Sequence, residues 1–543
     1  MATVFVNQIP VDIGNDKLNC VQAAERAGIL VPHYCWHPAL SVVASCRMCL
    51  IEVGDMKDGK PVMQPKVVPG CQTPVKDGTV IVTNSEKVKT AQAGTLEGLL
   101  LNHPLDCPVC DKAGECKLQD YSYQFGHSQS RLVDDKNQPP NKPHLSDKIT
   151  LFTDRCIMCT RCVRFTREIS GTAELQVINR GHHAEIDIFP DHPLNNKLSG
   201  NVVDLCPVGA LGSKDFLYTQ RVWYLKSNDS ICPGCSTGCS IHVDSNKGIV
   251  FRLRARTDLE NQGYFMCDEG RYGYHYIQAK ERLQRPFLRQ NNQFQSTNWG
   301  TVVQKIEDDF SQCFQDRKPM AIILSPMLTC EEAFMLARWG KSLSSDLTLV
   351  LGPVPVVGED DTYPKDRRGK PIQPVKFTIR REKCPNRLGV EAILNHFQGE
   401  VIPFSRWVES LAKSHCEIAW ITGSYPNPSW VPETSLEPLS KIKTLITHDL
   451  FASPLTKLSN YVLPATAFTE KQGLYVNHAG RIQSMDICSK APLEVRNEIQ
   501  VYHDLAGGRG IVQIDEIHEE MSQMIPFFAK LPRSKKLPEL AMI

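Results

Sequence analysis

The stretch "HPLDCPVCDKAGEC", residues 103–116, decides how this sequence is interpreted. Its three cysteines, Cys107, Cys110 and Cys116, have C-x2-C-x5-C spacing, and His103 stands four residues before the first. The preceding "LEGLLLN" has the apolar spacing of a helix end, and Asn102 and Pro104 fit a helix stop. His103 is therefore either a helix-end residue or a fourth ligand beside three thiols.

The other cysteines are clustered in the same way. Of the 21 in the 543 residues, 16 lie before residue 270. The further groups are Cys35, Cys46, Cys49 and Cys71 (C-x10-C-x2-C-x21-C), Cys156, Cys159 and Cys162 (C-x2-C-x2-C) with Cys206 before Pro207, and Cys232, Cys235, Cys239 and Cys267 (C-x2-C-x3-C-x27-C). A long chain with no recognisable secretory leader indicates metal binding rather than disulfides.

The spacing favours iron–sulfur clusters over zinc. A zinc ribbon usually pairs two C-x2-C knuckles, and none of these groups has two. Three close cysteines and one remote cysteine, as in the groups ending at Cys206 and Cys267, are typical of [4Fe–4S] sites. The 103–116 group lacks a fourth cysteine, and imidazole suits iron, so His103 with its three thiols is the simplest complete set.

The first group has the context of a [2Fe–2S] ferredoxin. "VFVNQIPVDI" predicts two short strands around a turn. "NCVQAAERAGI" predicts a helix with Asn19 as N-cap, Gln22 at the capping-box position and Gly28 near its end. Cys20 lies inside this helix and is expected in the core. Strand, strand, helix and cysteine loop is the order of a β-grasp ferredoxin.

With these motifs in order, the sequence resembles a known family, the large iron–sulfur subunit (the G subunit) of respiratory complex I, the proton-pumping NADH:quinone oxidoreductase. The segments that carry the resemblance are "SCRMCLIEV", "HPLDCPVCDKAGECKLQD", "DRCIMCTRCVRF" and "LSGNVVDLCPVGAL". It is specific over residues 1–280 and weaker afterwards.

The resemblance implies a multi-domain α+β and α/β fold. The expected domains are a [2Fe–2S] β-grasp domain (1–97), a His/Cys3 [4Fe–4S] domain (98–138), a ferredoxin-like [4Fe–4S] domain (139–224), a [4Fe–4S] domain of the molybdenum-enzyme type (225–281) and a degenerate molybdopterin oxidoreductase-like domain (282–543). The last is expected to be shortened and to hold no molybdopterin. Within it "MAIILSP", "CEIAWITGS" and "IKTLITHDL" predict buried strands.

The resemblance also implies the cofactors and the role. The expected ligands are Cys35, Cys46, Cys49 and Cys71 for one [2Fe–2S] cluster, and His103, Cys107, Cys110 and Cys116, then Cys156, Cys159, Cys162 and Cys206, then Cys232, Cys235, Cys239 and Cys267 for three [4Fe–4S] clusters. The chain is expected to pass electrons from an FMN/NADH-binding subunit to a ferredoxin-like subunit with two [4Fe–4S] clusters and so towards quinone. It would have no NAD or quinone site of its own and no catalytic acid, base or nucleophile. The fourth cluster is expected off the main path.

Two other oxidoreductase classes carry similar N-terminal modules, NAD-linked formate dehydrogenases and [FeFe] hydrogenases. Both usually have two complete C-x2-C-x2-C-x3-C-P runs, whereas Thr166 stands here where the fourth cysteine would be. A formate dehydrogenase needs a cysteine or selenocysteine on molybdenum, usually followed by His. None of the isolated Cys313, Cys330, Cys384, Cys416 and Cys488 has that neighbour, so all five are expected to be buried small hydrophobes.

Composition limits partners and location. A net charge of +1 gives no reason to expect nucleic acid, and no apolar run is long enough to span a membrane. The expected location is peripheral, on the cytoplasmic face of a bacterial inner membrane, through partner subunits.

The basic residues Arg155, Arg161 and Arg164 are expected on a solvated or interface surface, the alternative being that they tune the third cluster. Residues 134–145 are expected to be a linker and 352–374 a polar loop.

Overall fold

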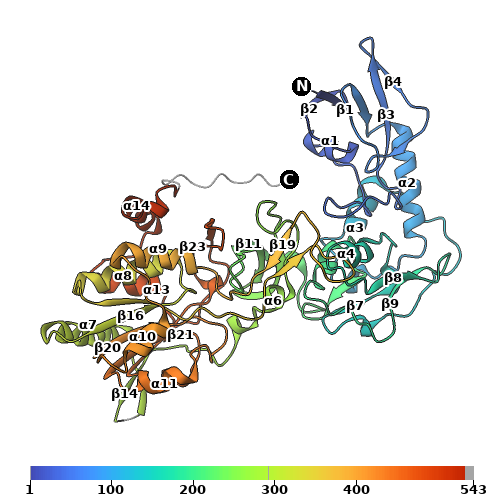
Figure 1. The fold of residues 1–543 in the computed structure, drawn as a ribbon. Helices are drawn as coiled ribbons and strands as arrows, with labels where there is room; N and C mark the ends of the chain where they lie inside the picture. Colours follow the sequence, from blue (N-terminus) through green and yellow to red (C-terminus); the bar gives the residue numbers. More distant parts are fainter. Residues whose placement is uncertain (1, 292, 532–543) are drawn as a thin grey trace. The chain divides into compact units, whose positions relative to one another are not determined.

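The computed structural model describes residues 2–291 and 293–531 as a mixed α/β protein (Figure 1). The chain divides into two units. Unit 1 comprises Met1–Leu225 with Thr362–Lys376, and unit 2 comprises Lys226–Asp361 with Phe377–Ile543. The segment Thr362–Lys376 begins inside the predicted polar loop 352–374 and ends two residues beyond it. It interrupts the sequence of unit 2 but belongs to unit 1.

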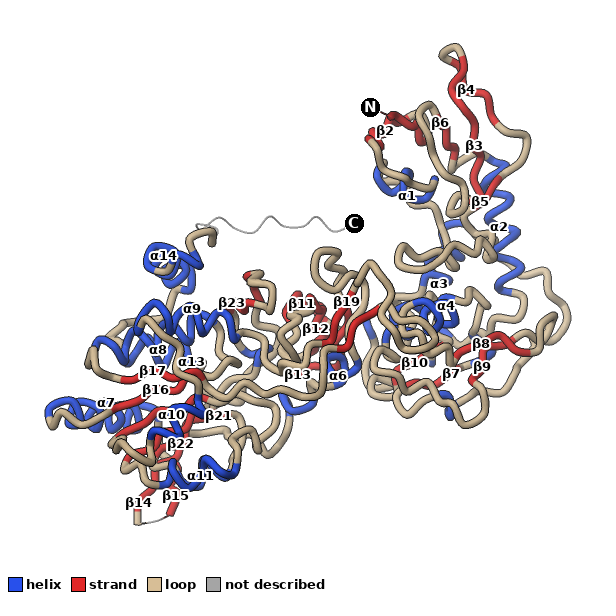
Figure 2. Tube along the Cα trace, viewed as in Figure 1, coloured by secondary structure: helices blue, strands red, loops and turns tan. Residues whose placement is uncertain are grey.

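Unit 1 begins with a six-stranded sheet in the order β2-β1-β6-β3-β4, with β5 paired to β3 (Figure 2). The bounds are β1 Ala2–Val6, β2 Ile9–Gly14, β3 Leu50–Lys57, β4 Lys60–Met63, β5 Val68–Pro69 and β6 Thr79–Val82. The predicted hairpin is confirmed, since β1 and β2 pair antiparallel, and β1 pairs parallel with β6. The predicted helix is confirmed as α1 Cys20–Arg26, with a capping box between Asn19 and Gln22. Cys20 is fully buried against the sheet.

The rest of unit 1 consists of short elements joined by long loops. The helices are α2 Glu86–Leu100, α3 Lys117–Phe125, α4 Arg161–Glu168 and α5 Asn201–Leu205. The strands form two small antiparallel pairs, β7 Ile149–Leu151 with β10 Leu211–Ser213 and β8 Leu175–Ile178 with β9 Glu185–Ile188. The cysteines of the second and third groups lie in the loops between these elements or at their ends.

Unit 2 opens with the antiparallel meander β11 Lys226–Ile231, β12 Ser240–Asn246 and β13 Ile249–Ala255, followed by α6 Asp268–Tyr272. A separate hairpin is formed by β23 Gly473–Val476 and β24 Ile482–Met485. The short strands β18 Asp361–Tyr363 and β19 Phe377–Ile379 lie where the chain passes between the units.

The main sheet of unit 2 has seven strands in the order β15-β14-β22-β21-β20-β16-β17. Their bounds are β14 Phe287–Gln290, β15 Gln293–Ser296, β16 Met320–Leu324, β17 Thr348–Leu351, β20 Ile418–Thr422, β21 Thr444–Asp449 and β22 Tyr461–Pro464. Strands β16, β20 and β21 are the three that the sequence predicts, and they pair in parallel. Helices surround the sheet: α7 Trp299–Gln315, α8 Cys330–Leu343, α9 Arg387–Gln398, α10 Phe404–Ser410, α11 Glu433–Ser440, α12 Pro454–Leu458, α13 Glu498–Leu505 and α14 Ile514–Met524.

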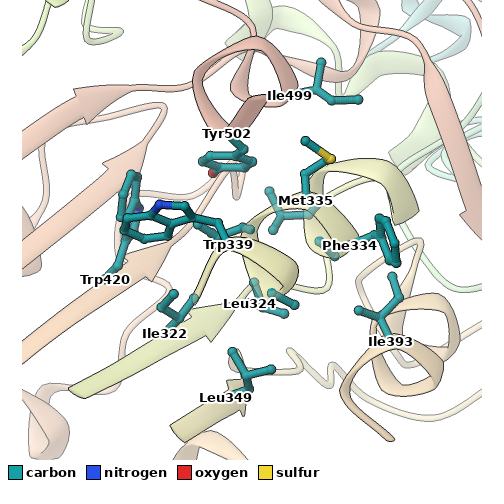
Figure 3. Close-up of a cluster of buried hydrophobic side chains, with 14 of the residues drawn as sticks. Ile322, Leu324, Phe334, Met335, Trp339, Leu349, Ile393, Trp420, Ile499 and Tyr502 are labelled. Carbon is teal, nitrogen blue, oxygen red and sulfur yellow. The ribbon is translucent and has the colours of Figure 1, made fainter. Parts of the chain in front are cut away.

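Both faces of this sheet are buried, as is usual for parallel strands. Along β16, Ile322 and Leu324 belong to one apolar cluster and Ala321 and Ile323 to another. Figure 3 shows the first cluster, in which Ile322 and Leu324 of the sheet lie near the side chain of Trp339 of α8. Among the described residues, no helix is both long and apolar enough to cross a bilayer.

Candidate metal centres

The first site lies between the loop after α1 and the turn after β5. Cys35, Cys49 and Cys71 are at most 1% exposed, and the backbone N–H of Cys35 donates to Sγ of Cys46 at 3.4 Å. Hydrogen bonds from the Cys46 and Cys71 thiols hold the pKa of Cys35 well below its usual value. A hydrogen bond from Cys71 likewise lowers the pKa of Cys49. The structure therefore brings the four predicted ligands together, three of them buried and Cys46 half-buried.

The second site lies in the loop between α2 and α3. Helix α2 ends at Leu100 with Leu101 as its C-cap, so His103 stands beyond the helix rather than capping it. Nδ1 of His103 is buried and has no hydrogen-bond partner among the described residues. Burial, with the nearby charges of Arg155 and Lys136, lowers the pKa of His103 to about 4. At neutral pH the ring is uncharged and offers an unused nitrogen, as a metal ligand must.

The three cysteines of this site range from buried to exposed. Cys116 is 7% exposed, Cys110 is half-buried and Cys107 is exposed. Burial raises the pKa of Cys110, and the charge of the nearby Cys107 raises it further. Burial and the charge of Cys110 do the same for Cys116. The three thiols are thus neighbours, and Arg155 interacts with both His103 and Cys110.

The expectation that the three arginines are solvated is wrong. Arg155, Arg161 and Arg164 are only 5%, 5% and 6% exposed. Arg155 donates from Nε and Nη2 to Oδ2 of Asp106 at 3.0 and 2.8 Å and lies 4.1 Å from the centre of the Phe152 ring. A buried guanidinium group needs hydrogen-bond acceptors close to it. The three arginines therefore lie inside the protein near the candidate sites and not on a solvated surface.

The third site is a small apolar cavity. Its lining residues are the four predicted ligands Cys156, Cys159, Cys162 and Cys206, together with Leu151, Ile157, Thr160, Arg161, Ile186, Val208, Ala210 and Leu211. The cysteine loop is shaped by Met158 and Thr160, whose positive φ values of 52° and 57° turn the backbone left-handed. Arg161 is the one charged residue in the lining.

The fourth site is a small cavity between β11, β12 and α6. Its lining residues are Cys232, Cys235, Cys239 and Cys267, with Gly234, Met266, Glu269 and Gly270. A Cβ at Gly270 would lie 2.8 Å from Sγ of Cys232, so glycine keeps this space open. Sequence reasoning missed this glycine because its close approach to a cysteine 38 positions earlier is a tertiary contact.

The donor sets and the cavities fit iron–sulfur clusters. Tetrahedral zinc holds its thiolates at about 2.3 Å from one ion. Within residues 2–291 and 293–531, no group of three or more His, Cys, Asp or Glu side chains is arranged to hold one metal ion. The third and fourth sites instead place four thiols around a cavity, as a larger polynuclear group requires.

Five further cysteines belong to no group of metal-binding side chains in the part of the chain that the structure describes. Cys313, Cys330, Cys384, Cys416 and Cys488 are all at most 7% exposed. Cys313 and Cys330 belong to one apolar cluster of unit 2, and Cys384 and Cys416 belong to another. Burial raises the pKa of Cys330 well above its usual value. The prediction that they are buried small hydrophobes is confirmed.

Five family matches follow the chain in the order that the motifs suggest. Residues 14–86 match a 2Fe-2S iron-sulfur cluster binding domain, and residues 92–131 match the NADH-ubiquinone oxidoreductase-G iron-sulfur binding region. Residues 146–212 match the ferredoxin-like domain of NADH-quinone oxidoreductase subunit 3. Residues 225–279 match the molybdopterin oxidoreductase Fe4S4 domain, and residues 398–507 match molybdopterin oxidoreductase.

Curated relatives that match 60% or more of this chain agree with these family matches. The G subunit of the NADH-quinone oxidoreductase of Rickettsia felis is 35% identical over 60% of this chain and 47% of its own length. The NADH-ubiquinone oxidoreductase 75 kDa subunit of Reclinomonas americana is 33% identical over 68% of this chain and 51% of its own length. The chain thus spans about half the length of these curated relatives.

A solved structure titled NAD+-reducing [NiFe]-hydrogenase in the H2-reduced state matches 41% of this chain and 91% of its own at 26% identity. Its TM-score of 0.35 is too low to bear on the assignment. The curated relatives do not favour a formate dehydrogenase or a hydrogenase. The matched domains, in this order, and these relatives identify the chain as a member of the family of NADH-quinone oxidoreductase G subunits.

Proposed function

We propose that this chain is the electron-relaying iron–sulfur subunit of a proton-translocating NADH:quinone oxidoreductase. It would take electrons from the NADH/FMN module and pass them towards quinone through a ferredoxin-like subunit. The observation that carries the proposal is the buried Nδ1 of His103, which has no hydrogen-bond partner among the described residues and stands four positions before Cys107. A histidine in this position completes the donor set of the one group that lacks a fourth cysteine.

Four sets of side chains would hold the cofactors. The [2Fe–2S] ligands would be Cys35, Cys46, Cys49 and Cys71, and the [4Fe–4S] ligands would be His103, Cys107, Cys110 and Cys116, then Cys156, Cys159, Cys162 and Cys206, then Cys232, Cys235, Cys239 and Cys267. When bound, such clusters supply one-electron carriers whose potentials depend on ligand type, burial and hydrogen bonding.

The chain's own residues would set those conditions. Aliphatic side chains such as Leu151, Ile186 and Val208 line the third site and exclude water from it. Burial, and after it the positive charge of Arg155, lowers the pKa of His103 and so keeps the ring neutral. A neutral imidazole in place of a thiolate lowers the negative charge of the site, which favours reduction.

We also propose the domain bounds, the partner subunits and the location of the chain. The five domains would be 1–97, 98–138, 139–224, 225–281 and 282–543. The partners would be the FMN/NADH-binding subunit and the ferredoxin-like subunit, and these would hold the chain at the cytoplasmic face of the inner membrane. The domain 282–543 would be a scaffold without molybdopterin.

The test is a measurement of iron, molybdenum and pterin in the anaerobically purified full chain, with EPR of the dithionite-reduced sample. One two-iron and three four-iron clusters correspond to about fourteen irons per chain. This content, with one [2Fe–2S] and several [4Fe–4S] signals, supports the proposal. Stoichiometric molybdenum with pterin would contradict it and favour a formate dehydrogenase-like enzyme.

A further inference from the structure

Helix α4 (Arg161–Glu168) joins the first and third sites within unit 1. It carries Cys162 of the third site, and three of its side chains contact the loop that follows Cys35. Glu168 accepts hydrogen bonds from the backbone N–H and the hydroxyl of Ser41 at 2.8 and 2.5 Å. This end of α4 is therefore fixed to the loop of the first site.

Arg164 contacts both sites directly. Its Nη1 donates to the carbonyl of Ser41 at 2.5 Å, and its Nη2 donates to the carbonyl of Cys35. The same Nη2 donates to the carbonyl of Cys159 at 3.3 Å. One guanidinium thus links the backbone of a candidate [2Fe–2S] ligand to the backbone of a candidate [4Fe–4S] ligand.

Arg161 repeats this arrangement one helical turn earlier. Its Nη2 donates to the carbonyl of Trp36 at 2.5 Å, next to Cys35, and its Nη1 donates to the carbonyl of Leu205 at 3.2 Å, next to Cys206. Its charge also interacts with the thiols of Cys159, Cys206 and Cys35. Both arginines therefore reach from the third site to the first.

The charges of these arginines have no carboxylate partner among the described residues. Their acceptors are backbone carbonyls, and Nε of Arg161 and Nε of Arg164 are buried without an acceptor. Burying a cation without a counter-charge is costly. The negative groups that act on Arg161 are the thiolates of Cys159, Cys206 and Cys35, which belong to both sites. A negatively charged cluster in either site would add to this counter-charge.

We propose that Arg161 and Arg164 are positioning residues that bridge the first and third sites and raise the reduction potential of both. The inference rests on the proposed function, since it requires clusters in both sites. A fixed positive charge favours the more negative, reduced form of each centre, and the fork of hydrogen bonds holds the two centres at constant separation.

The test is an EPR redox titration of the full chain with Arg161→Gln or Arg164→Gln. We expect the reduced-to-oxidised ratio of both centres at a given potential to fall at least tenfold, which is a shift of about 59 mV for a one-electron couple. Arg167→Gln is the matched control, because Arg167 lies on the same helix but is exposed. Arg161→Lys and Arg164→Lys, which keep the charge, should stay close to the wild-type potentials.

The outcomes separate this inference from the proposed function. Absence of both EPR signals from the wild-type chain would overturn the proposed function. Wild-type signals with unchanged potentials in both Gln variants would overturn the bridge and leave the proposed function standing. The Gln variants could bind too little iron for a titration. In that case the iron content of the Lys variants tests the role of the positive charge. Clusters retained in the Lys variants support that role, and loss of iron from the Lys variants as well would contradict it.

Discussion

Gly209 lies directly against the thiol of Cys110, so closely that a Cβ at residue 209 would be 2.1 Å from Sγ. The same Cβ would lie 3.2 Å from Cβ of Lys112. Gly209 follows Cys206 by three residues, so the segment that completes the third site also packs against a ligand of the second. The two sites therefore share one loop, and a side chain at residue 209 would displace Cys110.

Gly209→Ala is expected to remove the cluster of the second site selectively. The added methyl group cannot coexist with Cys110 in its present position, so about four of about fourteen irons should be lost. Iron analysis and EPR of the purified chain would measure this. Gly212→Ala is the control, because a Cβ there meets its nearest neighbours at 3.5 Å, an ordinary contact. Full iron content in the Gly209 variant would contradict the proposed ligation by Cys110.

His103→Cys is expected to retain a cluster in the second site with a lower reduction potential. A thiolate adds a negative charge where the imidazole is neutral, and added negative charge disfavours reduction. An EPR redox titration would measure the shift. His127→Cys, at an exposed position, serves as the control. An unchanged potential and spectrum in the His103 variant would count against ligation by His103.

Asp106→Asn is expected to destabilise the loop of the second site. Arg155 is almost fully buried, whereas the Asp106 side chain is 37% exposed. Asparagine keeps an acceptor oxygen but removes the negative charge, so the buried guanidinium loses its counter-charge. Loss of one partner of a fully buried pair costs about 3–5 kcal/mol, and the exposure of Asp106 reduces the expected loss to about 2 kcal/mol. A denaturant titration followed by the EPR signal of the second site would measure it. The exposed Asp134→Asn should have no effect, and equal stability of the two variants would contradict the prediction.

Local features of the fold could be predicted from the sequence. The capping box of Asn19 and Gln22 depends on residues three apart, and the strands β16, β20 and β21 are continuous apolar runs. The cysteine groupings were predictable for a related reason: three members of the third and fourth groups lie within a few residues, and the remote fourth follows a recognisable spacing. In the structure each of these two groups lines a single cavity.

The surroundings of the sites could not be predicted in this way. Arg161 and Arg164 have the sequence pattern of exposed basic residues on a short helix. They are buried because a loop more than a hundred residues earlier, around Cys35, packs against α4 and supplies carbonyl acceptors. The contact of Gly209 with Cys110 is equally non-local. Such features depend on tertiary packing, for which one sequence carries no local signal.

The last prediction concerns three buried charged side chains of unit 2, Lys471, Glu332 and Glu498. Nζ of Lys471 lies 2.9 Å from Oε2 of Glu332 and 3.4 Å from Oε1 of Glu498, and all three side chains are 1% exposed. Burial raises the pKa of Glu332 to about 7, and the negative charge of Glu498 adds to the rise, although the ammonium group of Lys471 opposes it. Glu332 also accepts a hydrogen bond from the backbone N–H of Thr329 at 2.9 Å as part of the cap of α8.

The raised pKa of Glu332 predicts the sign of a pH effect. The folded chain binds this proton more tightly than the unfolded chain, whose carboxyl has a pKa near 4.5. Stability from this group is therefore present below about pH 4.5 and is lost as the pH rises to about 7. His448 acts in the opposite direction, since burial lowers its pKa to about 4, so its contribution is lost as the pH falls from 6.5. The effect of Glu332 must accordingly be measured as a difference between variants.

Glu332→Gln is expected to remove this pH dependence while keeping an acceptor for the cap. Thermal melts of the full chain between about pH 4.5 and 7.5 should show wild-type unit 2 losing stability relative to the variant as the pH rises. Glu409→Gln, an exposed substitution on α10, should follow the wild-type curve. Parallel curves for wild type and Glu332→Gln would show that Glu332 does not take up a proton in this range. The opposite result, in which the Glu332→Gln variant loses stability relative to wild type as the pH rises, would show that the ionised carboxylate paired with Lys471 stabilises the fold.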